Sequence, residues 1–207
     1  MIYIYGDSHA NYSFKNLALP HHNFYENSIT MFRIGRDNNI INFKKEDIAK
    51  DISDTNNIII ISYGEIDCRC HIHRQINLQR DENDIIHELV NNYINAIHNH
   101  TIELGAKIII VGVIPPTTQS DYENLNGQIL HDFPFIGSNE DRVRYTQQTN
   151  KLLEDLSNKN KFIYFNPYHY YTRDDGTLKY ELSDNIVHIG DNTYFLDKFI
   201  ELYETLL

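Results

Sequence analysis

The chain has 207 residues, a formal net charge of −11 at pH 7 and 41% hydrophobic residues. This length suits one α/β domain over residues 1–207, with a single sizeable core, better than two. The negative charge opposes binding to phosphate-rich surfaces, so we expect neither a nucleic acid nor an anionic membrane surface as a partner.

Leader and anchor signals are absent from the sequence as given. No basic N-terminal region precedes a long apolar segment, and no apolar run approaches the ~20 residues of a membrane span. The two cysteines, Cys68 and Cys70, are too close together to staple a fold, which favours a reducing compartment. We therefore expect a cytoplasmic protein, or a domain taken from a longer chain.

The chain opens with a short apolar run from Ile2 to Tyr5, followed directly by Gly6, Asp7 and Ser8. A serine just past a buried strand lies at the carboxyl edge of a sheet, where open α/β folds bind ligands. Gly6 would permit a tight turn that presents the hydroxyl and the N–H of Ser8 to one substrate atom. Ser8 is therefore a candidate nucleophile. The alternative is that Asp7 or Ser8 only caps the next helix.

The following segments are predicted from their periodicity. We expect a short helix over 11–19 and a loop over 21–23. The segment 28–37 alternates polar and apolar residues as a half-buried strand does, and Gly35 marks a place where backbone could approach a ligand. Four consecutive isoleucines within 57–62 predict a strand buried on both faces, which is typical of a parallel sheet.

The densest polar cluster of the chain follows that strand and runs from Gly64 to His73. It contains Glu65, Asp67 and Arg69, and so many polar side chains cannot all enter a strand core. We expect them to face a cleft or to pair with one another. The Cys-x-Cys-His-x-His string within the cluster does not have the ligand spacing of zinc sites, so an ion-paired loop beside an active site is favoured over a metal centre.

The second half of the chain alternates amphipathic helices with apolar strands. The predicted elements are a helix over 84–104, a strand over 107–114, a helix over 138–157, a strand over 161–165, a turn or small hairpin over 168–180 and a helix over 195–206. The connection over 117–137 is long for a compact domain, and such loops often act as lids. This order predicts a single three-layer α/β/α sandwich around a mostly parallel sheet.

Three polar segments would converge on one edge of such a sheet: Ser8, the Gly64–His73 cluster and the segment from Asp184 to His188. A serine hydroxyl is a weak nucleophile unless a base takes its proton, and histidine does this best near neutral pH. A nearby carboxylate such as Asp184 would orient the imidazole and stabilise its charged form. The alternative for His188 is an ordinary histidine, because the chain has 11 of them.

These segments resemble the sequence blocks of the SGNH (GDSL-type) hydrolases. Gly6-Asp7-Ser8-His9 resembles the first block, and Gly64-Glu65-Ile66-Asp67 is similar to the third, normally Gly-x-Asn-Asp. Asp184 to His188 is similar to the last block, normally Asp-x-x-His. The resemblance spans nearly the whole chain. It implies a flavodoxin-like α/β/α fold and ester hydrolysis through an acyl-serine, without metal or cofactor.

The same resemblance implies the roles of the site residues. Ser8 would be the nucleophile and one oxyanion donor, His188 the general base and Asp184 its orienting partner. Gly35 would match the glycine of the second block, whose N–H is another oxyanion donor. The remaining candidates for oxyanion or substrate binding are Gly64, Glu65, Asp67 and Arg69.

Two departures from the family pattern affect the expected chemistry. Ile66 occupies the position of the third-block asparagine, and losing one oxyanion donor typically costs on the order of 10²–10³ in rate. Arg69 is a candidate substitute. Asp184 lies four residues before His188, and Asn185 occupies the usual position three before it. Asp184 reaches the histidine only if the loop bulges; otherwise the site is a Ser–His dyad.

The sequence therefore predicts a serine esterase that hydrolyses an O-acyl ester, with O-acetyl on a carbohydrate as the first choice and another small-molecule ester as the broader class. The first alternative is an O-acetyltransferase acting in glycan modification, with which a cytoplasmic location and a polar cleft rich in His, Arg and Tyr are compatible. The Gly64–His73 cluster also resembles that of an SGNH-like subgroup linked to bacterial or viral glycan assembly. The second is a non-catalytic glycan-binding module on the same fold, motivated by the two departures.

Overall fold

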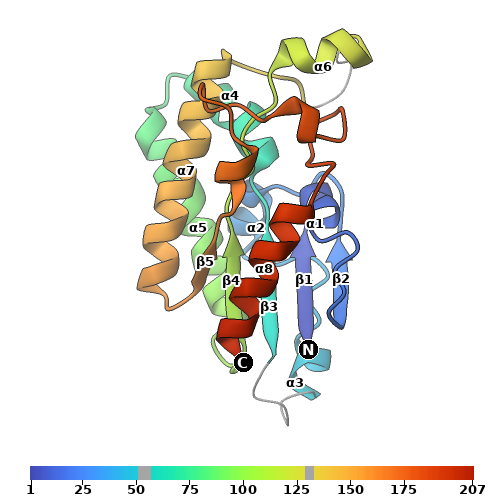
Figure 1. Ribbon diagram of the computed structural model, residues 1–207. Coiled ribbons are helices and arrows are strands. Elements are labelled where there is room, and N and C mark those ends of the chain that lie inside the picture. The colour runs from blue at the N-terminus through green and yellow to red at the C-terminus, as the bar shows by residue number, and fades with distance from the viewer. Residues whose placement is uncertain (51–56, 129–132) are drawn as a thin grey trace.

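The computed structural model describes residues 1–50, 57–128 and 133–207 (Figure 1). Within them, five strands form one sheet in the order β2-β1-β3-β4-β5, and all the neighbouring pairs are parallel. The strands are β1 (Ile2–Gly6), β2 (His21–Tyr25), β3 (Ile58–Ser62), β4 (Lys107–Val111) and β5 (Ile163–Phe165). This order is that of flavodoxin-like folds, as predicted.

The central strands are built from β-branched and aromatic residues. Every residue of β1 and β3 is buried, because helices cover both faces of the sheet. Successive side chains of a strand point to opposite faces, so the isoleucines of β3 feed two cores. Ile59 and Ile61 enter one cluster, and Ile58 and Ile60 enter the other.

The helices form one layer on each face of the sheet. The first layer contains α2 (Met31–Asp37), α5 (Glu82–Thr101) and α7 (Asn139–Lys159), whose apolar side chains join the Ile59 cluster. The second contains α1 (Ser8–Ser13) and α8 (Thr193–Leu206), and α8 crosses the front of the sheet in Figure 1. The predicted three-layer α/β/α sandwich is confirmed.

Shorter helices complete the described chain. They are α3 (Lys45–Lys50), a π-helical turn η2 (Asp67–His71), α4 (Ile72–Ile76), α6 (Gln119–Asn126) and two 3-10 turns, η3 (Tyr168–Tyr171) and η4 (Tyr180–Leu182). Among the described residues, none of the helices combines the length and the apolar character needed to cross a lipid bilayer.

The prediction of a strand over 28–37 is wrong. The second strand is His21–Tyr25, of which residues 21–23 were predicted as loop, and α2 begins at Met31. Thr30 caps this helix, because its hydroxyl accepts a hydrogen bond from the backbone N–H of Arg33 at 3.1 Å. Met31 and Ile34, three residues apart, are the buried residues of α2. A spacing of three puts both side chains on one face of a helix, whereas on a strand they would point to opposite faces.

Other boundaries moved less. The helix predicted over 11–19 is the shorter α1, which begins at Ser8, whereas the helices predicted over 84–104 and 138–157 are α5 and α7. A capping box of Ser138 and Asp141 begins α7. The region 168–180 contains η3 and an antiparallel bridge between Thr172 and Leu178.

Two segments predicted as loops contain helices. The polar cluster after β3 continues into η2 and α4. The connection over 117–137 contains α6, and its residues 129–132 lie outside the part of the chain that the structure describes.

Candidate active site

Ser8 is the first residue of α1, directly after the carboxyl end of β1. Asp7 caps the helix, and its Oδ1 accepts a hydrogen bond from the N–H of His9 at 2.9 Å. Gly6 does not have the positive φ expected for a tight turn. Glycine is needed there because a Cβ would lie 2.2 Å from the Cβ of Ala10. The missing side chain therefore lets α1 start close against the sheet.

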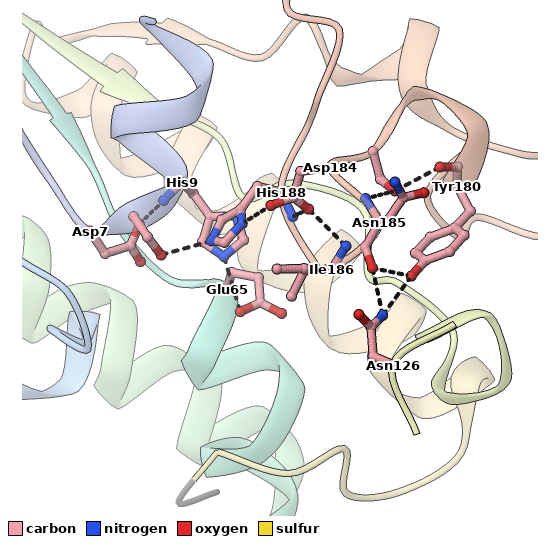
Figure 2. A network of polar contacts seen from close by, with 11 residues as sticks. Asp7, His9, Glu65, Asn126, Tyr180, Asp184, Asn185, Ile186 and His188 are labelled. Atoms are coloured by element: carbon pink, nitrogen blue, oxygen red, sulfur yellow. Dashed lines mark hydrogen bonds and ion pairs between the residues drawn. The ribbon is translucent and has the colours of Figure 1, made fainter. Parts of the chain in front are cut away.

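The structure brings Ser8, His188 and Asp184 together. Nε2 of His188 lies 2.9 Å from Oγ of Ser8. Its Nδ1 lies 2.6 Å from Oδ2 of Asp184, as Figure 2 shows for these two residues. When Nδ1–H donates to the carboxylate, Nε2 is unprotonated and accepts a hydrogen bond from the serine hydroxyl. This is the arrangement of nucleophile, base and orienting acid found in serine hydrolases.

The loop from Asp184 to His188 bulges, as its extra residue requires. Asn185 has a φ of 66°, in the left-handed region that asparagine tolerates better than most residues. The N–H of Asp184 donates to the carbonyl of His188 at 3.0 Å and closes the loop. Oδ1 of Asp184 accepts from the N–H groups of Ile186 and His188, at 2.9 and 3.1 Å. Its carboxylate is therefore held inside the loop and still reaches the imidazole.

The imidazole of His188 lies between two other rings. The ring of Tyr12 stacks on it at 4.2 Å and 3°, and the ring of His9 lies 4.5 Å away. Burial, together with the nearby positive charge of His9, lowers the pKa of His188 although Asp184 opposes this shift. A lowered pKa keeps His188 neutral near pH 7, the form that can accept a proton.

A buried charged chain lies beside the base. Nε2 of His9 lies 3.2 Å from Oε2 of Glu65, and Oε1 of Glu65 forms an ion pair with Nε of Arg69 at 3.0 Å. Burial favours the neutral form of Glu65, but Arg69 and His9 outweigh it and lower the pKa of Glu65 to about 2. Burial also opposes charge on His9, but the carboxylates of Asp7 and Glu65 raise its pKa. Glu65 and Arg69 therefore form an ion pair beside the candidate site. Glu65 also contacts His9, whose ring lies against that of His188.

Two predicted site residues have other roles in the structure. Asp67 accepts hydrogen bonds from the N–H groups of Met31 and Phe32, at 2.7 and 3.3 Å, so its carboxyl caps α2. Gly35 lies inside α2, where a Cβ would be 2.8 Å from the Cβ of Asn92 in α5. Its glycine is explained by close helix packing, and the structure does not place it in a loop that approaches a ligand.

Gly64 and Ile66 shape the start of the segment after β3. Gly64 has a φ of 127°, and a Cβ would lie 2.7 Å from the Cε of Met31. A side chain there is excluded by both backbone conformation and space. Ile66 is buried and apolar, so its side chain supplies no hydrogen-bond donor in place of the asparagine of the family pattern. Arg69 lies almost one helical turn further on, with its guanidinium 5.5 Å from the ring centre of Phe135.

The sequence reasoning missed two residues that contact the base, His9 and Tyr12. Both could have been found from Ser8: His9 follows it directly, and Tyr12 lies four residues on, which places it on the same face of a helix. Cys68 and Cys70 are free and buried, and within residues 1–50, 57–128 and 133–207 no three His, Cys, Asp or Glu side chains gather as a metal-binding group.

Comparison with known proteins gives matches at the level of structure. No family model and no curated protein matches the sequence. A GDSL-like lipase from Bacteroides thetaiotaomicron is 12% identical with a TM-score of 0.56, covering 100% of this chain and 88% of its own. The chain has the fold of the SGNH hydrolases.

Two further structures share this SGNH fold. A protein from Streptococcus pneumonia is 15% identical with a TM-score of 0.66, and the match covers 100% of this chain and 83% of that one. A carbohydrate acetylesterase from Sinorhizobium meliloti is 12% identical with a TM-score of 0.54, covering 100% and 99%. Both matches therefore extend over the full length of this chain.

Proposed function

We propose that residues 1–207 form one catalytic domain, a serine esterase that hydrolyses an O-acyl ester through an acyl-serine. The observation that carries the proposal is the continuous contact from Oγ of Ser8 through the imidazole of His188 to the carboxylate of Asp184. A carboxylate, an imidazole and a hydroxyl in this order activate the hydroxyl for attack on a carbonyl carbon.

In the proposed reaction, Oγ of Ser8 attacks the ester carbonyl while Nε2 of His188 takes its proton. Asp184 stabilises the imidazolium that forms. The tetrahedral intermediate then collapses: the bond to the alcohol oxygen breaks, and His188 returns the proton to that oxygen. Water, deprotonated by the same Nε2, attacks the carbonyl carbon of acyl-Ser8. The bond between that carbon and Oγ then breaks, His188 returns the proton to Oγ, and the carboxylic acid is released. The N–H of Ser8, in the first turn of α1, has no partner within the helix and is available to the oxyanion.

Arg69 supports the same site in our proposal. The side chain of Ile66 offers no donor, whereas the guanidinium of Arg69, three residues further on, is a cationic group held in place by Glu65. A charge-assisted donor of this kind stabilises an oxyanion more strongly than a neutral amide. It would therefore compensate for the missing asparagine.

The proposed substrate is a short acyl ester, with acetyl on a carbohydrate as the first choice. One protein of the same fold is described as a carbohydrate acetylesterase, which supports testing this class first. An O-acetyltransferase would use the same acyl-serine with a sugar hydroxyl in place of water. Incubation with an acetyl donor and sugar acceptors separates the two, because a hydrolase releases free acetate and a transferase yields acetylated sugar.

The test of the proposal is covalent labelling with a fluorescent serine-directed phosphonate. We expect labelling of the wild type and loss of labelling in Ser8→Ala and His188→Ala. Ser120→Ala and His87→Ala are matched controls on exposed helix positions and should label as the wild type does. A folded wild-type protein that neither labels nor turns over any short-chain ester would contradict the proposal and favour a non-catalytic glycan-binding module.

A further inference from the structure

The extra residue of the Asp184–His188 loop is anchored from outside the loop. The carbonyl oxygen of Asn185 accepts two hydrogen bonds, from the hydroxyl of Tyr180 at 2.5 Å and from Nδ2 of Asn126 at 2.6 Å (Figure 2). Asn126 is the last residue of α6, 59 positions earlier in the chain. A different element of the fold therefore holds the residue that separates this loop from the usual Asp-x-x-His spacing.

The anchored peptide controls where the carboxylate of Asp184 points. Oδ1 of Asp184 accepts from the N–H of Ile186, the residue directly after the anchored carbonyl. Both Asn185 and Ile186 are exposed, so packing contributes little to holding this part of the loop. The two hydrogen bonds to the Asn185 carbonyl therefore add an external restraint to those inside the loop, where the N–H of Asn185 donates to Oγ of Ser183 at 3.0 Å.

The helix that carries Asn126 has few other attachments. Residues 119–126 include no buried side chain. At its start, Asp121 pairs with Arg173 at 2.7 Å. In its middle, the ring of Tyr122 lies 5.7 Å from the ring of Phe135, which in turn contacts the guanidinium of Arg69. The helix thus touches the His188 side of the candidate site through its last residue and the Arg69 side through Tyr122.

We propose that Asn126 is a positioning residue for His188, which holds the Asn185 carbonyl and so couples α6 to the geometry of the base. The catalytic part of this inference rests on the proposed function; the positioning part does not. A substrate that contacts α6 would, through this coupling, also affect the conformation of the loop that carries His188.

The test uses Asn126→Leu, which keeps the size of the side chain and removes its donor. The amides of Ile186 and His188 report on the loop through hydrogen exchange, because both donate to Asp184. We expect their exchange to become about fivefold faster, since one lost hydrogen bond is worth about 1 kcal/mol. With a short-chain ester, kcat should fall about fivefold to tenfold while KM stays unchanged. The thermal midpoint should fall by about 2–4 °C, as the same loss of about 1 kcal/mol implies. Tyr180→Phe should act in the same direction.

Leu125→Ala, at the neighbouring exposed position of α6, is the matched control and should leave exchange and kcat as in the wild type. Unchanged exchange of the two amides in Asn126→Leu overturns the inference. If the wild type shows no phosphonate labelling and no turnover, the proposed function fails, and the exchange comparison still decides whether Asn126 positions the loop.

Discussion

Oδ2 of Asp184 lies 2.6 Å from Nδ1 of His188 although the two residues are one position further apart in the chain than in the usual Asp-x-x-His block. The bulge at Asn185 takes up the extra residue, and the carboxylate accepts two loop amides as well as the imidazole. This contact favours a triad over a Ser–His dyad in the proposed site.

Replacement of the carboxylate by an amide tests that triad. In Asp184→Asn, the remaining oxygen can still accept the loop amides, but the NH2 group then faces Nδ1 of His188 and forces the proton onto Nε2. A protonated Nε2 cannot accept the Ser8 proton, so we expect kcat/KM to fall on the order of 10³–10⁴-fold with little change in stability. Asp174→Asn, at an exposed position, is the control; a loss below tenfold in Asp184→Asn would argue for a dyad.

The pH dependence of activity should reveal the influence of His9. Activity requires neutral His188 and is lost as the pH falls through its pKa. Because burial and the charge of His9 lower that pKa, we expect activity to persist below pH 6.5. In His9→Gln the nearby cation is removed, so the pKa of His188 should rise and the acidic limb of kcat/KM should move to higher pH. A limb that stays in place or moves lower would show that His9 does not act on the base electrostatically.

The ion pair of Glu65 and Arg69 should matter for stability. Glu65→Gln leaves a buried guanidinium without its counter-charge, and we expect a loss of about 3 kcal/mol in the free energy of unfolding at pH 7. The folded pKa of Glu65 is about 2, below its ordinary value of 4.5, so this stabilisation should disappear as the pH falls from about 4.5 towards 2. Urea denaturation across that range measures it.

Glu88→Gln is the matched control, because Glu88 pairs with Arg80 on the surface. Exposed pairs contribute about 0–1 kcal/mol, so its effect should be small. Equal losses in Glu65→Gln and Glu88→Gln would mean that the buried pair does not stabilise the fold more than a surface pair does.

The buried carboxyl of Asp67 should change the free energy of unfolding with pH in the opposite direction to Glu65. Burial raises its pKa to about 7 despite the N–H groups of Met31 and Phe32. Between its unfolded value near 3.8 and pH 7, the folded state therefore retains a proton that the unfolded state releases, so this group makes stability fall as the pH rises. Asp67→Asn keeps an acceptor for the two amides and removes the titration. We expect the stability difference between Asp67→Asn and wild type to grow in favour of the variant from pH 5 to pH 8.

The parts of the fold that were predicted from sequence are those with strong periodicity. The isoleucine run of β3 and the apolar face of α5 are buried, so their sequence patterns indicated a strand and a helix without ambiguity. Among the strands that the structure describes, the edge strand β2 pairs only with β1, and it is largely exposed, so no apolar pattern marked His21–Tyr25. The helix α6 buries none of its residues and left no pattern either.

The residues of the candidate site that lie in short sequence blocks similar to those of the SGNH hydrolases could be predicted. Ser8, Asp184 and His188 lie together as the block order implied. Gly35 was misplaced because its segment was assigned to the wrong type of element, and a glycine in a packed helix cannot be told from one in a loop by identity alone. The anchoring by Asn126 depends on a contact between distant segments, which no local pattern reports.

The hydrogen bond between Ser8 and His188 joins residues 180 positions apart. Ser8 is therefore synthesised 180 residues before His188, its base in the proposed site. On the ribosome, the contact between Ser8 and His188 cannot form until residue 188 has been synthesised and has left the exit tunnel. In refolding, the return of Ser8 reactivity would time the docking of the C-terminal segment, because that step completes the pair. The rate at which Ser8 regains its reactivity would thus report the rate at which the C-terminal segment packs onto the rest of the fold.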